Sequence, residues 1–391
     1  MALSESEIIE LIQIRRHLHR RPELGFQEEA TGRFIASYLR ELGCEVQTGI
    51  GGTGVVGLLR GKHSERVVLL RADMDALPIQ EAVPSDYQSE RPGVMHACGH
   101  DGHMAMALMA AQRLNAEKST LNGSVKFVFQ PAEELLSGAQ RMVDDGVLND
   151  PAVQAAFGVH LWNNLDVGQV GVVAGPMMAS VDRFELLITG RGGHGAMPHQ
   201  TIDPIVVAGH VVTALQTIVS RSVNPLEPAV VTIGTIHAGT AFNVIADTAL
   251  MSGTVRVFDR ISYESVPHQL EQIVAGVCHA FGAEYELRYD RFCEPMVNDA
   301  AMAMLASQVA SQIVGTGNVV GTNEARTTCG EDMSVFLKHV PGCYLFVGSR
   351  NRARQLDQPH HSARFDFDEA ALPIGVEILE GLAKSYLAEA V

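Results

Sequence analysis

The sequence predicts an α/β fold in which a catalytic domain, built on a layered and mainly parallel sheet, is interrupted by an inserted α+β domain. The run 67–70 is apolar without alternation and predicts a strand buried on both faces, as in parallel sheets, and 124–130 is expected to be another buried strand. Segments with helical periodicity alternate with these strands. From about residue 184 the order becomes strand–helix–strand–strand–helix–strand, which predicts a compact antiparallel unit.

A chain of 391 residues is longer than one compact core normally contains, so two domains are expected. The catalytic domain is expected to comprise residues 1–183 and 297–391, because the α/β pattern resumes after the insertion. The inserted domain is expected at 184–296, with a four-stranded antiparallel sheet and two helices.

The individual elements follow from periodicity and from the residues that interrupt it. Pro22 and Gly25 end the first helix, and Gly43 ends the second. In the catalytic domain the expected helices are 5–21, 28–42, 104–114, 138–145, 300–314, 332–339 and 369–387. The expected strands there are 45–49, 55–60, 66–73, 124–130, 155–161 and 343–348. The insertion is expected to contain strands 183–191, 229–237, 248–258 and 284–291 and helices 203–221 and 263–281.

Charge and composition exclude some classes of function. The formal net charge of −16 argues against nucleic acid or an anionic membrane as a standing partner, but it does not exclude an anionic small molecule. Six cysteines without paired spacing indicate reduced thiols in a cytoplasmic protein. The first residues lack the pattern of a signal peptide, and no uninterrupted apolar run of membrane-spanning length is expected.

The segment 95–103, MHACGHDGH, concentrates a thiol, three imidazoles and a carboxylate in nine residues. On an extended segment, the two-residue spacing of Cys98 and His100 would place both side chains on one side. A thiolate and an imidazole that face one point suit zinc or another late divalent metal. The alternative is a buried thiol beside a histidine that is satisfied by a backbone carbonyl.

Further candidates follow buried strands or lie in loops. Glu133 and Glu134 come directly after strand 124–130 and a proline. Because adjacent side chains point in different directions, one carboxylate can bind metal while the other serves as a base. Taken singly, each candidate has a simpler explanation. The two glutamates could lie in a solvated turn, and His361 could be part of a solvated loop. His160 could be a core residue whose ring nitrogens are hydrogen-bonded within the protein. Taken together, the candidates suffice for two metals that share a bridging group.

Nine motifs, in order along nearly the whole chain, resemble those of the dinuclear-metal amidohydrolases of the aminoacylase–carboxypeptidase superfamily. The nearest branch is similar to hippurate hydrolase and to the plant hydrolases of indole-acetyl-amino-acid conjugates. The motifs are RHLHRRPEL (16–24), RADMDALPI (71–79), MHACGHDGHMA (95–105), FQPAEE (129–134), GVHLW (158–162), GGHGAMPH (192–199), FNVIAD (242–247), GTVR (253–256) and HSARFDFDEAALP (361–373).

Matched motif by motif, the resemblance implies roles for individual residues. It implies that Glu133 is the general base and that Asp75 orients a ligand. Asp73 stands where other branches have a metal-binding histidine, and it is not expected to be a ligand. The implied metal ligands are Cys98, which would bridge the two ions, and His100, Glu134, His160 and His361.

The resemblance also implies that the inserted domain is a lid that mediates dimerisation, so a homodimer is expected. His194, Asn243 and Arg256 match lid residues that approach the substrate. The segment 328–333 departs from the Gly-Ser-Glu-Asp-Phe pattern of the family, which leaves the preferred acyl group open.

The implied reaction is hydrolysis of the amide bond of N-acyl amino acids, such as hippurate-like conjugates, to a carboxylic acid and a free amino acid. Two divalent ions would activate a water molecule, and Glu133 would take its proton. Manganese or zinc is expected, with cobalt or nickel as alternatives. Two other readings stay open: a metallo-carboxypeptidase or dipeptidase on the same scaffold, and a metal-binding relative without catalysis.

Overall fold

The computed structural model describes residues 2–62 and 65–388, which form two compact units. The first unit comprises the chain up to Met177, Val297–Arg326 and the chain from Asp332 onward. The second unit comprises Met178–Met296 and Thr327–Glu331. The function of the second unit as a lid and dimerisation domain stays a prediction.

The first unit is built on an eight-stranded, mostly parallel sheet, as the sequence predicted. Its strand order is β1-β2-β4-β3-β5-β16-β6-β15, and the central neighbours β4, β3, β5 and β16 are all parallel. The strands are β1 (Glu45–Ile50), β2 (Gly54–Arg60), β3 (Val67–Asp73), β4 (Ser124–Gln130), β5 (Ala155–Asp166), β6 (Val170–Gly171), β15 (Val319–Val320) and β16 (Gly342–Arg350). Every residue of β3 and β4 is buried, which explains why the apolar run at the start of β3 does not alternate with polar residues.

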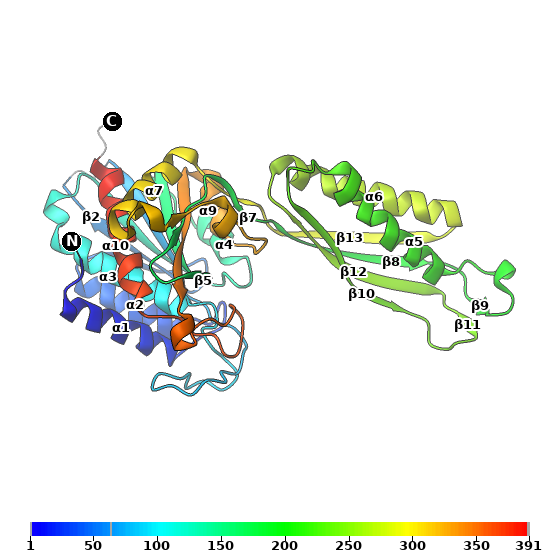
Figure 1. Cartoon of the computed structure of the whole chain (residues 1–391), viewed down its shortest axis with the longest axis horizontal. Helices are drawn as coiled ribbons and strands as arrows, with labels where there is room; N and C mark the ends of the chain where they lie inside the picture. Colours follow the sequence, from blue (N-terminus) through cyan, green and yellow to red (C-terminus); the bar gives the residue numbers. More distant parts are fainter. Residues whose placement is uncertain (1, 63–64, 389–391) are drawn as a thin grey trace. The chain divides into compact units, whose positions relative to one another are not determined.

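Helices cover both faces of this sheet. Helices α3 and α10 pack against each other, with α1 against α3 and α7 against α10, and they share one apolar core with the sheet (Figure 1). Helices α4 and α9 contact the sheet and each other, and their buried residues lie outside that core. The helices are α1 (Glu5–His19), α2 (Glu29–Glu41), α3 (His100–Ala116), α4 (Gly138–Asp144), α7 (Ala300–Val314), α8 (Thr322–Ala325), α9 (Met333–His339) and α10 (Ala371–Ala388).

Helix α3 begins earlier than the sequence predicted, and this corrects the geometry expected for the MHACGHDGH segment. We expected Cys98 and His100 on an extended segment, with a helix only from residue 104. Instead, His100 is the first residue of α3, and Gly99 is its N-cap with a left-handed φ of 89°. Glycine adopts this conformation without the steric cost of a Cβ atom, so the chain turns sharply between the two side chains.

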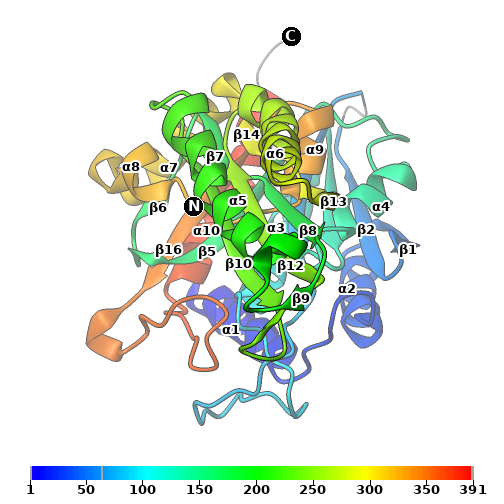
Figure 2. The same cartoon turned by 90° about the vertical axis from the view of Figure 1, so that its right-hand side faces the viewer.

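The second unit has an antiparallel four-stranded sheet with two helices on one face, as predicted. The strand order is β10-β12-β8-β13, and α5 and α6 pack against each other and against the sheet (Figure 2). Residues of β8 alternate between buried and more exposed positions, as expected for a sheet covered on one face. The elements are β8 (Val181–Thr189), α5 (Pro204–Thr217), β10 (Ala229–Ala238), β12 (Thr248–Val257), α6 (Arg260–Phe281) and β13 (Glu284–Cys293).

One segment of the described chain, Pro204–Ser222, is long and apolar enough to cross a membrane by length and composition alone. The sequence analysis expected no such segment. In the structure, Val207, Val211 and Leu215 of this segment lie in the apolar core of the second unit, whereas Ile205 and Val206 are exposed. One-sided burial of this kind is typical of an amphipathic helix that covers a sheet.

Close packing of α3 against β5 leads to the first prediction. A Cβ atom added at Gly102 would lie 2.5 Å from Cδ1 of Leu161 and 2.9 Å from Cζ of Phe367. Gly102→Ala should therefore lower the free energy of unfolding by about 1–3 kcal/mol through overpacking. The control is Gly276→Ala in α6, where an added Cβ atom meets nothing within 4 Å. The control should raise stability by up to about 1 kcal/mol, because alanine favours helix.

Denaturant unfolding of the two variants measures this difference. If Gly102→Ala were as stable as Gly276→Ala, the contact between α3 and β5 would be looser than the structure indicates.

Candidate metal centre

The candidate donor groups meet at the edge of the sheet where the parallel strands end. Asp75 follows β3, Glu133 and Glu134 follow β4, and His100 begins α3. His160 lies on β5 beside them. Carboxyl ends of parallel strands are the usual place for chemistry in α/β folds. The expected ligands fall into overlapping groups whose donor atoms lie within 4.8 Å of one another: Cys98, His100 and His160; Cys98, Glu134 and His361; His100, Glu133 and Glu134.

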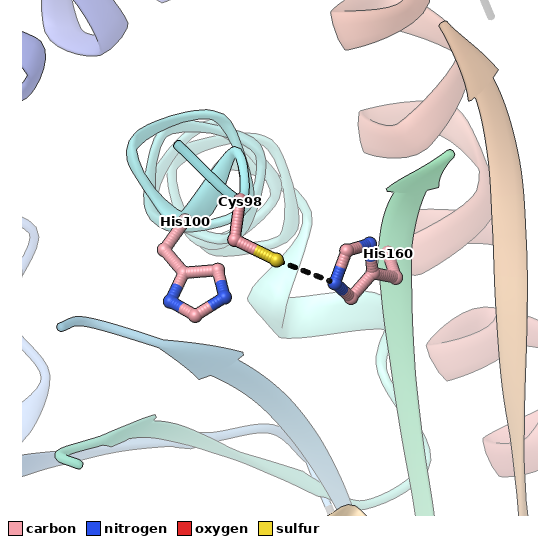
Figure 3. Close-up of side chains that lie close together, drawn as sticks. All are labelled: Cys98, His100 and His160. Atoms are coloured by element: carbon pink, nitrogen blue, oxygen red, sulfur yellow. Dashed lines mark hydrogen bonds between the residues drawn. The ribbon is translucent and has the colours of Figure 1, made fainter. Parts of the chain in front are cut away.

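Two histidines direct their Nε2 atoms toward the centre. Nδ1 of His160 donates to the Leu161 carbonyl oxygen at 2.6 Å, and its Nε2 lies 3.6 Å from Sγ of Cys98 (Figure 3). Nδ1 of His100 donates to the Asp75 carbonyl oxygen at 2.9 Å. A bond at Nδ1 fixes the tautomer and leaves the Nε2 lone pair available to a metal.

His361 reaches the same place from a distant loop. Its backbone N–H donates to the Ala97 carbonyl oxygen at 2.8 Å, and Nε2 lies 3.2 Å from Oε1 of Glu134. The residue has a left-handed φ of 64°, which is unfavourable for a side chain of this size. Its side chain is 53% exposed, so this ligand position faces solvent.

The two glutamates differ in their surroundings. Oε2 of Glu133 lies 4.0 Å from Nε2 of His100, and Oε1 of Glu134 lies 3.9 Å from the same atom. The backbone N–H of Glu134 donates to Oδ2 of Asp75 at 3.0 Å. Glu134 also lies in a group of candidate metal-binding residues with His361 and Cys98. Glu133 shares no such group with His361. Glu134 therefore shares a donor group with His100 and another with His361, whereas Glu133 shares one with His100 but none with His361.

Electrostatics at this centre favour a cation. Burial alone would lower the pKa of His100, but Asp73, Asp75 and Glu134 raise it to about 10. Burial, and then Glu134 and Glu133, raises the pKa of the Cys98 thiol. Carboxylates that favour a proton on His100 favour a divalent ion at the same place.

An unpartnered buried atom supports this interpretation. Nε2 of His100 is buried and has no hydrogen-bond partner among the residues that the structure describes. A buried polar atom without a partner is costly, and a metal ion would satisfy it. One thiol, three imidazoles and a carboxylate form a donor set suited to zinc or another late divalent metal, so the residues present fit two such ions.

His103, which the sequence analysis did not select, connects three of the elements at this site. Its Nδ1 donates to Oδ1 of Asp73 at 2.6 Å, and its Nε2 accepts from the Leu161 N–H at 2.9 Å. Asp73 also accepts from Arg71 at 2.7 Å. These bonds link α3, β3 and β5 beside His160. The motif that contains His103 was recognised, but spacing along the chain could not distinguish a ligand from a residue that positions one.

His360 was also missed. Its Nε2 accepts from the Asn163 N–H at 3.2 Å, and its Nδ1 lies 3.9 Å from Sγ of Cys98. The ring stacks on Trp162 with 4.8 Å between centroids. The sequence analysis treated this residue as part of a solvated loop, because two adjacent histidines carry no signal of which one is the less exposed.

The predicted catalytic residue His194 and the predicted substrate-binding residues Asn243 and Arg256 lie in the second unit. His194 on β9 (Gly193–His194) pairs with Val244 on β11 (Val244–Ile245), next to Asn243. Arg256 is near the opposite end of β12 and donates to the Ser180 carbonyl oxygen at 3.2 Å. In Figure 1 the β9–β11 pair lies beyond the end of the sheet where β12 begins. The structure therefore brings His194 and Asn243 together and separates Arg256 from both.

The family model for peptidase family M20/M25/M40 matches residues 69–385. The chain belongs to this family. It is 48% identical over 290 residues to the N-acyl-L-amino acid amidohydrolase of Geobacillus stearothermophilus, covering 74% of this chain and 78% of that protein. It is 39% identical over 385 residues to the IAA-amino acid hydrolase ILR1-like 4 of Arabidopsis thaliana, covering 97% and 86%. These similarities confirm the resemblance drawn from the nine motifs.

A solved structure agrees with the fold of this M20 hydrolase. The crystal structure of the Bacillus subtilis YXEP protein, described as a dinuclear metal-binding peptidase of the M20 family, matches with a TM-score of 0.85 and 36% identity. The match covers 98% of this chain and 99% of that protein. It supports the expectation of a dinuclear centre and does not identify the metal.

Proposed function

We propose that this M20 hydrolase cleaves the amide bond of N-acyl amino acids and releases a carboxylic acid and a free amino acid. The observation that carries the proposal is the cluster of overlapping donor groups, in which Glu133 shares a group with His100 and Glu134 and none with Cys98, His160 or His361. The similarity to an N-acyl-L-amino acid amidohydrolase supports the choice of substrate class.

We assign the two metal ions to the five ligands that the family resemblance implies. Cys98 is placed at the junction, because it belongs to one donor group with His100 and His160 and to another with Glu134 and His361. When bound, two divalent ions lower the pKa of water and polarise the acyl carbonyl.

The residues of the chain handle the proton. Oε2 of Glu133 accepts the proton of the water whose oxygen attacks the acyl carbon, and it then passes that proton to the nitrogen of the leaving amine as the C–N bond breaks. Asp75 holds the loop that carries both glutamates through the hydrogen bond that it accepts from the Glu134 N–H. Burial of Glu133 limits exchange of this proton with bulk water.

The lid residues supply the other contacts in this proposal. Arg256 would seat the substrate carboxylate, with Asn243 as a further hydrogen-bonding group, and His194 would stabilise the developing oxyanion. Eight residues of β12 separate Arg256 from the end of the strand near His194, a span of roughly 26 Å at 3.3 Å per residue. One small substrate cannot touch both ends of one lid, which favours contributions from the lids of two protomers.

The alternative substrate is a peptide, because the YXEP protein is described as a peptidase. A panel of N-acyl amino acids and dipeptides, assayed with manganese, zinc, cobalt and nickel in turn, distinguishes the two. Release of free amino acid from the N-acyl compounds, with little cleavage of dipeptides, is the expected result. Preferential cleavage of dipeptides would favour the carboxypeptidase or dipeptidase reading.

The second prediction separates the adjacent glutamates. Glu133→Gln removes the base but no ligand, so kcat should fall by about 10²–10⁴ while metal content is unchanged. Glu134→Gln should lose bound metal as well as activity. Elemental analysis and steady-state kinetics measure both effects. Near-normal kcat in Glu133→Gln would place the base elsewhere.

The third prediction tests whether His194 acts across a dimer. Glu133→Gln and His194→Ala should each be nearly inactive alone. In a mixed dimer, the His194→Ala protomer keeps its own Glu133 and receives His194 from its partner, so one of the two sites is intact. Random exchange makes roughly half the dimers mixed, which should restore about a quarter of wild-type activity.

Co-expression with two different tags, followed by tandem purification, isolates the mixed dimer, which should show about half of wild-type activity because one of its two sites is intact. Mixed dimers that recover no activity would show that His194 does not act across the interface, as would a fully active monomer at the assay concentration.

A further inference from the structure

Glu28 is a fully buried carboxyl group that the proposed mechanism does not use. It precedes α2 at the N-cap position, yet its side chain makes no capping hydrogen bond to that helix. Within the described part of the chain no lysine, arginine or histidine lies within ion-pair distance of it. Buried glutamates are rare without such a partner, so another interaction must account for this one.

Its two partners come from distant segments. Oε2 accepts from the Thr53 hydroxyl at 2.5 Å, and Oε1 accepts from the Ala132 N–H at 2.9 Å. Ala132 is the residue before Glu133. On the other side of Glu133, the Glu134 N–H donates to Asp75. The backbone N–H groups on both sides of the proposed base are therefore each held by a buried carboxylate.

The conformation of this loop needs such support. Ala132 has a left-handed φ of 50°, and Leu136 has the same value. Residues with a Cβ atom rarely adopt this region, and they do so where surrounding contacts impose it. Gly25 provides a second contact, because a Cβ atom built there would lie 3.1 Å from Cβ of Ala132. The segment of residues 25–28 thus packs directly against the strained residue.

Burying this carboxyl has a cost. Burial raises the pKa of Glu28 to about 7, although the hydrogen bonds to Thr53 and Ala132 act in the opposite direction. The folded-state pKa is above the unfolded value, so this group lowers stability as the pH rises from the unfolded value toward 7. An acceptor that costs stability and takes hydrogen bonds from the Thr53 hydroxyl and the Ala132 N–H is better explained by the geometry it imposes than by its effect on stability.

We propose that Glu28 is a positioning residue for Glu133 and Glu134, acting through its hydrogen bond to the Ala132 N–H. The inference rests on the proposed roles of Glu133 as base and Glu134 as ligand. Glu28 contacts neither substrate nor metal. It fixes the backbone from which both carboxylates project, in the way that residues behind metal ligands orient them.

The test compares two replacements of similar size. Glu28→Met fills the space but accepts no hydrogen bond, whereas Glu28→Gln keeps an oxygen that can accept from the Ala132 N–H. Glu28→Met should lower kcat, and the affinity for manganese or zinc measured by chelator competition, by about 10–100-fold. Its KM at saturating metal should stay near the wild-type value. Glu28→Gln should keep most of the wild-type kcat and metal affinity.

Two controls separate positioning from general damage. Glu29→Ala, one residue along the chain, removes a largely exposed side chain whose ion pair with Arg33 is also exposed, and it should behave as wild type. Thr53→Val removes the donor to Oε2 of Glu28 without touching the loop, and it should cause a smaller loss in the same direction. This variant also covers the case in which Glu28→Met does not fold.

A double-mutant cycle tests the route of action. In a Glu133→Gln background the base is already absent, so Glu28→Met should lower kcat no further, while it still weakens metal binding through Glu134. An equal fold-loss of kcat in both backgrounds would overturn the proposal, as would damage in Glu28→Gln as large as in Glu28→Met. If the wild-type protein hydrolyses no N-acyl amino acid, the proposed function fails, and the metal-affinity measurements still decide the role of Glu28.

Discussion

The first unit buries more negative than positive charge at one edge of its sheet, and the rest of the site depends on this imbalance. Asp73, Asp75, Glu133 and Glu134 are buried or nearly so around the Cys98 thiol. Arg71 is the cation that ion-pairs with Asp73, and it is shared with Asp332. Isolated buried charges cost several kcal/mol each, so the arrangement favours bound cations. Two divalent ions would supply such cations.

Three of the four segments that carry the donors share one backbone feature, and the fourth is strand β5 with His160. Each of the three has a left-handed residue at or next to a proposed functional side chain: Gly99 between Cys98 and His100, Ala132 before Glu133, and His361 itself. Two of these are not glycine and need support from outside their own segment. Ala132 receives it from Glu28, and His361 from the Ala97 carbonyl oxygen. The donors therefore converge because the surrounding fold holds strained backbone in place.

Much of the fold could be predicted from the sequence, because burial on two faces and burial on one face leave different patterns. The runs in β3 and β4 predicted a parallel sheet, and the alternation in β8 indicated a sheet covered on one face. The start of α3 could not be predicted in the same way. The residues of the first turn, His100–His103, are polar, and the left-handed Gly99 that caps the helix carries no periodic signal. His103, His360 and Glu28 were missed for a related reason: their roles come from hydrogen bonds to residues at least 25 positions away, which no local pattern reveals.

Metal content is the most direct test of the central claim that this buried charge holds two divalent ions. Protein treated with a chelator and dialysed should be inactive and should unfold at a lower temperature than protein reloaded with manganese or zinc, because an ion that binds only the folded state stabilises it by mass action. Elemental analysis of the reloaded protein should give two ions per chain. Full hydrolysis of an N-acyl amino acid by protein shown to contain no metal would contradict the account.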